Sequence, residues 1–289
     1  MASKIRTPAP GDAVVLSGAA FRLNNDECST LVLQDGGDSE WRAKQELSLD
    51  SYAIQHVNRD IDPATYAVYR LFGDYINSAA YRSRAERPLI LDVGCGIFPK
   101  LSPALERLDE RCEYVGLDPL ARNLERSYPF VCGRLEDLAL LTGFRPRFDV
   151  FVFGTSLDHL ADLPSAAAAV RRLAAPGAML VCWNGLTEPE KIISGNGVAV
   201  FRQLLRYRFL PVALCAYAGY GLVRLPRLLR QLRIRGDKLA KGAALDHHFR
   251  WFTEANTPAY LATFGEVIDF VVLPNTNHSF ATVRIRANS

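Results

Sequence analysis

Two glycines that follow an acid in an apolar run form the stretch of this chain best suited to holding a ligand. Leu89–Val93 is long enough for a buried strand and too short for a helix, and Gly94-Cys95-Gly96 ends it. Gly94 and Gly96 can take backbone angles closed to other residues, and they leave room for a ligand to lie against the main chain. Asp92 falls at the carboxyl end of the strand, where ligands bind in open α/β sheets. The stretch therefore predicts a binding site with an acid beside it.

The glycine pattern does not suit a dinucleotide, because a G-x-G-x-x-G site needs a third glycine where this chain has Pro99. The order hydrophobic-Asp-Val-Gly-Cys-Gly instead resembles the first motif of class I S-adenosylmethionine (SAM)-dependent methyltransferases. SAM carries no phosphate, and its cationic methionine amino group suits an acid such as Asp92. The resemblance implies that Asp92, Gly94, Cys95 and Gly96 bind SAM. The alternative is a glycine turn in some other α/β protein.

A second acid ends the next predicted strand, Cys112–Asp118. Parallel strands joined by a crossover bring Asp118 to the same sheet edge as Gly94. A carboxylate there can accept both ribose hydroxyls, so the resemblance implies that Asp118 and Pro119 border the ribose of SAM. The alternative is that Asp118 caps the segment that follows it.

A third segment, Pro129–Leu138, resembles the Gly-Asp-Ala-Glu-x-Leu phrase that holds adenine in these methyltransferases. The usual Asp of the phrase is Arg134 here, which leaves the adenine contact open. The resemblance implies that Glu136 or Asp137 accepts the adenine amino group and that the Leu135 amide reads a ring nitrogen. The alternative is that both acids are a solvated helix start.

The strand Phe148–Gly154 and the following Thr-Ser-Leu-Asp-His resemble the fourth motif of the family, in which Gly154 would border the sulfonium. His159 could take a proton from an acceptor hydroxyl during methyl transfer, because histidine titrates near neutral pH. The alternative is that His159 is pocket wall. His247 and His248 are rival bases, because the resemblance implies that their segment passes over the pocket mouth. Adjacent histidines in an extended segment point to opposite faces, so we expect no metal site.

Further predicted elements position these residues. They are a helix from Asp62 to about Tyr81, a helix over Ser102–Leu108, a helix over Ala166–Leu173, a strand over Ala178–Trp183, a helix from Phe252, and strands over Val267–Leu273 and Phe280–Ile285. Five strand–helix units predict an α/β fold with a doubly wound, Rossmann-like sheet. The resemblance, which covers about 62–186 and 247–287, implies seven strands with an antiparallel last strand.

The domain organisation follows from these elements. We expect an N-terminal cap or lid over 1–60, a SAM-binding core over 61–186, a helical insertion over 187–246 and the C-terminal part of the core over 247–289. Insertions at 187–246 commonly cover the acceptor pocket in the family that the chain resembles.

The insertion has an apolar run, 209–223, between basic flanks. Segment 201–241 holds ten Arg and Lys residues against Asp237 alone, a net charge of +9, whereas the whole chain carries +3. Such a segment can be a plain helical cap, a lid over the acceptor, or a peripheral membrane contact. The apolar run is too short for a comfortable membrane span. Nucleic acid is the less favoured partner, because stacking aromatics are few and the net charge is small.

The remaining composition is that of a globular protein of the cytoplasm. The six cysteines are scattered without a C-x-x-C pair and read as small buried hydrophobes. The N-terminal residues lack the apolar core of a signal peptide.

We therefore expect a SAM-dependent methyltransferase, with S-adenosylhomocysteine (SAH) as product and no metal. The acceptor atom is expected to be an oxygen of a small-molecule, sugar or lipid-linked acceptor in a biosynthetic pathway. One alternative is an RNA methyltransferase, although the Asn/Asp-Pro-Pro-Tyr motif of many base-modifying members is absent after Gly154. The other is a non-catalytic partner protein with a decayed SAM fold. The sequence leaves the oligomeric state open.

Overall fold

The computed structural model describes residues 4–9, 12, 14–17, 20–23, 26–34, 41–42, 45, 63–97, 99–120, 124–141, 148–186, 250, 252–274 and 276–286. All of them belong to one compact unit, which comprises Met1–Leu186 and His248–Ser289. The histidines His247 and His248 and the insertion 187–246, with its basic segment 201–241, lie outside the described residues.

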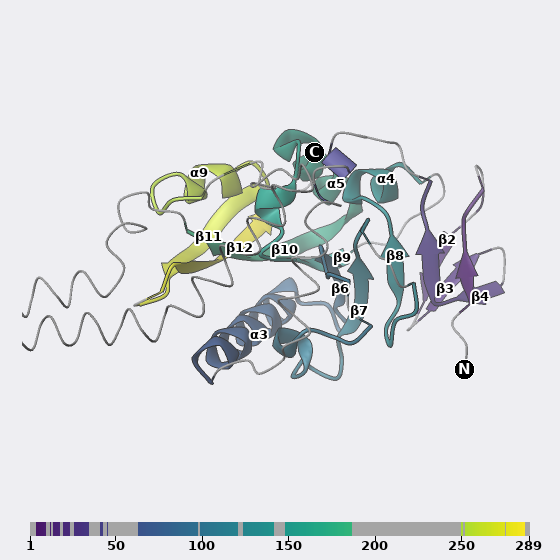
Figure 1. Ribbon diagram of the computed structural model, residues 1–289, viewed down its shortest axis with the longest axis horizontal. Coiled ribbons are helices and arrows are strands. Elements are labelled where there is room, and N and C mark those ends of the chain that lie inside the picture. The colour runs from purple at the N-terminus through teal and green to yellow at the C-terminus, as the bar shows by residue number, and fades with distance from the viewer. Residues whose placement is uncertain are drawn as a thin grey trace, which may run out of the picture. The chain divides into compact units, whose positions relative to one another are not determined.

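A nine-stranded sheet forms the centre of this unit, in the order β1-β5-β8-β7-β6-β9-β10-β12-β11. Its strands are β1 (Ile5–Arg6), β5 (Thr30–Val32), β6 (Leu89–Val93), β7 (Glu113–Leu117), β8 (Phe130–Cys132), β9 (Phe148–Gly154), β10 (Ala174–Gly185), β11 (Gly265–Val272) and β12 (His278–Ile285). β12 runs antiparallel to both β10 and β11, while the other pairs are parallel. The doubly wound, Rossmann-like α/β fold with its antiparallel last strand is therefore confirmed (Figure 1).

The strand count is larger than the seven we expected, because two N-terminal strands extend the sheet beyond β8. Leu31 in β5 is fully buried, and its strand pairs in parallel with β8. The amide of Phe130 donates to the carbonyl of Ser29 at 2.9 Å, and the amide of Leu33 donates to the carbonyl of Cys132 at 2.9 Å. Part of the segment expected as a cap is thus built into the main sheet.

A second, three-stranded antiparallel sheet also comes from the N-terminal part of the chain. It consists of β2 (Val14–Ser17), β3 (Ala20–Leu23) and β4 (Asp26–Cys28). Val14, Phe21 and Cys28 are buried and pack with the core on one face of the main sheet.

Helices cover both faces of the main sheet (Figure 1). One face carries α3 (Pro63–Ser83), and the other carries α4 (Leu135–Leu140), α5 (Leu163–Leu173) and α9 (Thr257–Leu261). Two apolar clusters result, one between α3 and the sheet and one on the opposite face. This layering explains why strands such as β9 are apolar almost throughout, since both of their faces are covered.

The helix predicted over Ser102–Leu108 is wrong, because only a 3₁₀ turn forms at Pro103–Leu105. Ser102 precedes the turn in an extended conformation, and its side chain makes no capping hydrogen bond. The chain after the turn is held against α3 instead: the Asn77 side chain donates to the carbonyl of Arg107 and accepts from the amide of Asp109, both at 3.0 Å. These tertiary bonds replace the helical ones that the local pattern predicted.

The last helix is also shorter than expected, since α9 begins at Thr257 and not near Phe252. Thr253 and Asn256 bond reciprocally before it, with the Thr253 amide donating to Asn256 Oδ1 at 2.8 Å and the Asn256 amide donating to Thr253 Oγ1 at 3.2 Å. These reciprocal bonds satisfy two backbone amides just before α9, in the manner of a capping box.

The described helices contain none that is both long enough and apolar enough to cross a membrane.

The place of β5 in the main sheet predicts that Leu31 matters for stability. We expect Leu31→Ala to lower the free energy of unfolding by about 2 to 5 kcal/mol, because it leaves a cavity in a fully buried position. Ile5→Ala on the neighbouring β1 is the control; its side chain is 44% exposed, so the change should stay within about 0.5 kcal/mol. Chemical denaturation of both variants measures the difference, and equal effects would contradict this placement of β5.

Candidate functional site

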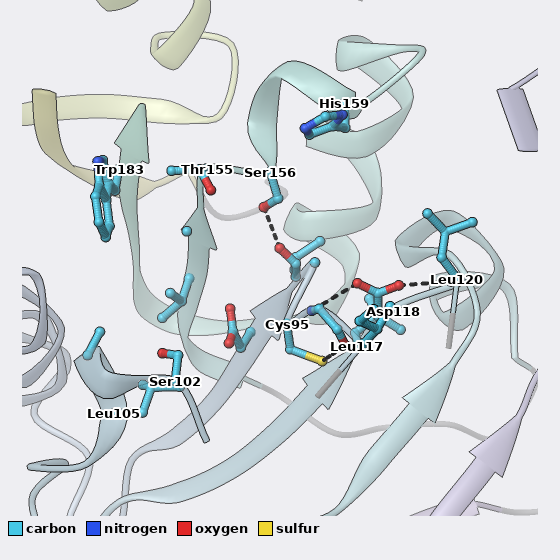
Figure 2. Close-up of a pocket in the computed structure, with 18 of the residues that line it drawn as sticks. Cys95, Ser102, Leu105, Leu117, Asp118, Leu120, Thr155, Ser156, His159 and Trp183 are labelled. Atoms are coloured by element: carbon cyan, nitrogen blue, oxygen red, sulfur yellow. Dashed lines mark hydrogen bonds between the residues drawn. The ribbon is translucent and has the colours of Figure 1, made fainter. Parts of the chain in front are cut away.

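A cavity of about 790 Å³ opens at the carboxyl ends of the central parallel strands. Of the cofactor-contact residues expected from the sequence, all but Asp137, the alternative to Glu136, line it: Asp92, Gly94, Cys95, Gly96, Asp118, Pro119, Leu135, Glu136 and Gly154. Figure 2 shows Cys95 and Asp118 at one side of the cavity, Trp183 at the other, and Thr155 and Ser156 between them. The parallel pairing of β6 with β7 and β9 brings these residues to one edge of the sheet.

The glycine turn lies in the backbone region that glycine favours. Gly94 has a φ of 80° and Gly96 a φ of 84°. A Cβ placed on Gly94 would lie only 2.5 Å from the Cβ of Ser156, a separation that side chains do not tolerate. The Ser156 hydroxyl donates to the carbonyl of Val93, which ties the chain after β9 to the turn after β6. Only glycine at position 94 permits this close approach.

Asp118 follows β7 directly and is buried, with 7% of its surface exposed. Its carboxylate accepts from the amide of Gly96 at 3.0 Å and from the amide of Leu120 at 2.8 Å. Burial raises the pKa of Asp118, and these two hydrogen bonds and the nearby Arg126 act against that rise. The bond from Leu120 closes a turn after β7, and the described residues that follow Asp118 form no helix that it could cap. Each carboxylate oxygen keeps a lone pair that can accept a ligand hydroxyl.

Asp92 lies at the end of β6 and is 6% exposed. The hydroxyl of Tyr114 donates to its Oδ2 at 2.8 Å. Burial raises the pKa of Asp92 to about 7; the bond from Tyr114 opposes this rise and the charge of Asp118 adds to it. A cationic ligand in the cavity would favour the ionised form of this carboxyl group.

Arg134, the departure from the adenine-binding phrase, is paired with Asp137. Its Nε lies 2.9 Å from Asp137 Oδ2, and its terminal nitrogen lies 3.1 Å from Oδ1. Asp137 is not among the residues that line the cavity, whereas Glu136 is. Burial raises the pKa of Glu136. Of the two acids that we considered for the adenine amino group, the structure brings Glu136 to the cavity.

His159 lines the same cavity and sits on the 3₁₀ turn Leu157–His159, above Ser156 (Figure 2). Its Nε2 lies 3.7 Å from Asp158 Oδ1. Its carbonyl accepts from the indole Nε1 of Trp41 at 2.9 Å, and the Arg250 side chain donates to the carbonyl of the next residue, Leu160. His159 is therefore held by its backbone, with an acid beside its ring.

The sequence reasoning missed several residues of this site. Trp41 and Gln45 reach the cavity from the N-terminal segment, and Gln45 is 1% exposed. Tyr114 supports Asp92 from within β7, although it appeared only as a strand residue. Nothing in the local pattern around Trp41 marks it as part of the site, because tertiary folding brings it beside His159, which is distant in the sequence.

In the described part of the chain, no three or more His, Cys, Asp or Glu side chains lie together so that they could hold a metal ion.

The chain resembles known methyltransferases in sequence over part of its length and in fold. Residues 91–180 match the sequence model of a methyltransferase domain family. No curated protein matches the chain. Among solved structures, the chain is similar to the 1,6-didemethyltoxoflavin-N1-methyltransferase of Burkholderia thailandensis, crystallised with 1,6-didemethyltoxoflavin and SAH, at 14% identity and a TM-score of 0.50, over 87% of this chain and 92% of that one. It is also similar to the N-methyltransferase NodS of Bradyrhizobium japonicum in complex with SAH, at 13% identity and a TM-score of 0.46, over 82% of this chain and 98% of that one.

The contacts of Asp118 predict its effect on cofactor affinity. We expect Asp118→Ala to weaken SAM and SAH binding by about 100-fold. The reason is that the variant loses the two charge-assisted hydrogen bonds that the carboxylate is expected to accept from the ribose hydroxyls. Asp74→Ala on the exposed side of α3 is the control and should leave the affinity unchanged. Calorimetric titration of both variants measures the effect, and a variant at position 118 that binds like the wild type would exclude this carboxylate from the cofactor site.

The raised pKa of Asp92 predicts that SAM binding depends on pH. Near its pKa of about 7 the carboxyl group holds a proton in part of the free protein, and a SAM ammonium group bound beside it, as the resemblance implies, would favour the carboxylate. Binding then releases a proton, so affinity should rise as pH rises from about 5.5 to about 7, before the ammonium group itself deprotonates near about 7.8. In Asp92→Asn this rise should vanish. Calorimetry at several pH values, in buffers of different ionisation enthalpy, measures both the slope and the proton release.

Proposed function

We propose that this chain, which contains a class I SAM-dependent methyltransferase domain, transfers the methyl group of SAM to an oxygen atom of a small-molecule, sugar or lipid-linked acceptor in a biosynthetic pathway. The observation that carries the proposal is one continuous cavity, which joins the glycine turn and the two buried acids to His159. A donor bound at the glycine turn and the proposed base would therefore border the same space.

The charge of the cavity supports SAM as the donor. Four acids line it, namely Asp92, Glu106, Asp118 and Glu136, and among the described lining residues Lys100 and Arg134 are the cations. Arg134 is paired with Asp137. A surplus of acid suits a sulfonium with a cationic ammonium group, and it opposes a phosphate-rich ligand.

His159 supports an oxygen acceptor. In the proposed step the acceptor oxygen attacks the methyl carbon, the bond from carbon to the sulfonium breaks, and SAH leaves with the electron pair. The hydroxyl proton passes to His159, whose positive charge the adjacent Asp158 stabilises. Holding the donor and the acceptor in line supplies much of the rate by positioning.

The two alternatives have weaker support. An RNA acceptor would bring phosphates to a cavity whose described lining carries more acids than bases. The alternative of a decayed, non-catalytic domain was based on Arg134, which replaces the usual Asp of the adenine-binding phrase. Arg134 is paired with Asp137, however, and Glu136 lies at the cavity. The two similar structures are named as N-methyltransferases, so nitrogen is the competing acceptor atom.

We also propose that the basic segment 201–241 contacts a membrane surface when the acceptor is lipid-linked, and that the protein works in the cytoplasm. The support for the membrane contact is the net charge of +9 on that segment around an uncharged run. The support for the cytoplasm is the six scattered cysteines, which form no C-x-x-C pair.

A variant of His159 tests the proposed chemistry. Once a screen of phenols, sugars and lipid-linked alcohols finds an acceptor that releases SAH, His159→Gln should lower kcat about 100-fold or more, because the base is lost. The affinity for SAH should be unchanged. If His159 only forms pocket wall, KM changes and kcat with its pH profile does not.

Two other outcomes would overturn larger parts of the proposal. Folded wild-type protein that binds neither SAM nor SAH would rule out methyl transfer and favour the non-catalytic alternative. A product methylated on nitrogen, identified by mass spectrometry and NMR, would overturn the oxygen acceptor alone.

A further inference from the structure

The cavity extends beyond the glycine turn to a wall of aromatic side chains. Tyr69 and Phe72 of α3 and Trp183 of β10 line this end and will be called the aromatic wall. The ring centroids of Tyr69 and Trp183 lie 4.9 Å apart, and those of Phe72 and Trp183 lie 5.5 Å apart, both in edge-to-face contact. Phe280 of β12 packs behind, 5.2 Å from Phe72 and 5.8 Å from Trp183. The rings brace one another, so the wall is formed before any ligand binds.

The aromatic wall lies beside the end of β9, where the family resemblance implies that Gly154 borders the sulfonium. A Cβ placed on Gly154 would lie 3.7 Å from the ring of Phe72. The next residue, Thr155, donates its amide to the carbonyl of Trp183 at 2.8 Å and lies between Trp183 and Ser156 (Figure 2). A molecule held against the wall would therefore reach the end of β9.

Thr155 itself is held in an unusual conformation. Its φ is 59°, in the left-handed region that a β-branched residue rarely occupies, and its side chain is exposed to the cavity. Such strain persists where the surrounding structure imposes it, and it is commonest at functional sites. The strained turn places a hydroxyl group next to the aromatic wall.

The surface that the wall offers is apolar and uncharged. Trp183 is 6% exposed, and its Nε1 is buried without a hydrogen-bond partner in the described part of the chain, so the indole presents carbon atoms to the cavity. Ile76 and Leu105 line the cavity nearby and are almost fully buried. Burial raises the pKa of Tyr69, which keeps its hydroxyl neutral and able to donate. An ionic ligand would gain no counter-charge from these side chains.

We infer that the aromatic wall is the acceptor subsite and that it takes a planar aromatic molecule with a neutral hydroxyl group. The inference deepens the proposed function and depends on it. Aromatic rings gain from edge-to-face and offset contacts with one another beyond the burial of apolar area, and a saturated ring of the same size does not. Tyr69 and Thr155 supply the hydroxyl groups that can orient the acceptor oxygen.

Two probes of matched size test this subsite. Binding of 2-naphthol and of its saturated counterpart, decahydro-2-naphthol, is measured by calorimetry on wild-type protein saturated with SAH. We expect 2-naphthol to bind about fivefold more tightly, in line with the gain from aromatic pairs. Hydrophobicity alone predicts the opposite order, because the saturated compound is the more apolar of the two. Equal affinities, a preference for the saturated probe, or no binding of either probe would overturn the inference.

Variants then locate the preference. Tyr69→Leu should reduce the preference to about twofold or less, with SAH affinity unchanged. Tyr75→Leu is the matched control: it removes a ring from the same helix, one that packs on Phe280 at 5.2 Å but does not line the cavity, so the preference should persist. Loss of the preference in both variants, or in neither, would contradict the assignment to the wall.

The order of measurements separates this inference from the proposed function. SAH binding is measured first on the same protein. If SAH does not bind, the methyltransferase proposal fails; if SAH binds and 2-naphthol shows no preference, only the acceptor class fails.

Discussion

The close contact between the turn after β6 and the chain after β9 is the constraint on which the site depends. Gly94 has no side chain and a positive φ, so the chain at Ser156 can approach within a distance that a Cβ would forbid. The Ser156 hydroxyl then bonds to the carbonyl of Val93, and the Gly94 amide bonds to the carbonyl of Leu117. Three strand ends are tied together in this way. The acids, the glycine turn and the His159 turn consequently face one cavity.

In the free protein, burial of two carboxyl groups in that cavity makes their ionisation costly in free energy. Asp92 and Asp118 are each less than a tenth exposed. The charge of Asp118 raises the pKa of Asp92, and both charges raise the pKa of Cys95. The hydroxyl of Tyr114 and the amides of Gly96 and Leu120 offset part of the cost. A cation bound there would offset more of it. The arrangement thus lowers the stability of the empty site and raises its affinity for a positively charged donor.

The acceptor side of the cavity depends on a segment whose structure differs from the helix that its local sequence predicts. Where the sequence pattern predicts a helix after the glycine turn, the chain makes one 3₁₀ turn and bonds to α3 through Asn77. The carbonyl of Ala104 lies against Gly73 of α3, at a spot where a Cβ would come within 2.3 Å of it. α3 is thereby held close to the cavity, and its Tyr69 and Phe72 form the aromatic wall with Trp183.

Much of this could be predicted from the sequence, because the information is local. Asp92, Gly94 and Asp118 stand at the ends of apolar runs, and parallel pairing alone brings such ends to one edge of a sheet. Strand β9 occurs at the residues we expected, since its run is apolar and bounded. Only the tertiary structure decided the rest: the pairing of β5 with β8, the arrival of Trp41 at His159, and the loss of the helix after Ser102. Each of these depends on hydrogen bonds and packing between residues far apart in the chain, and no periodicity within one segment records such contacts.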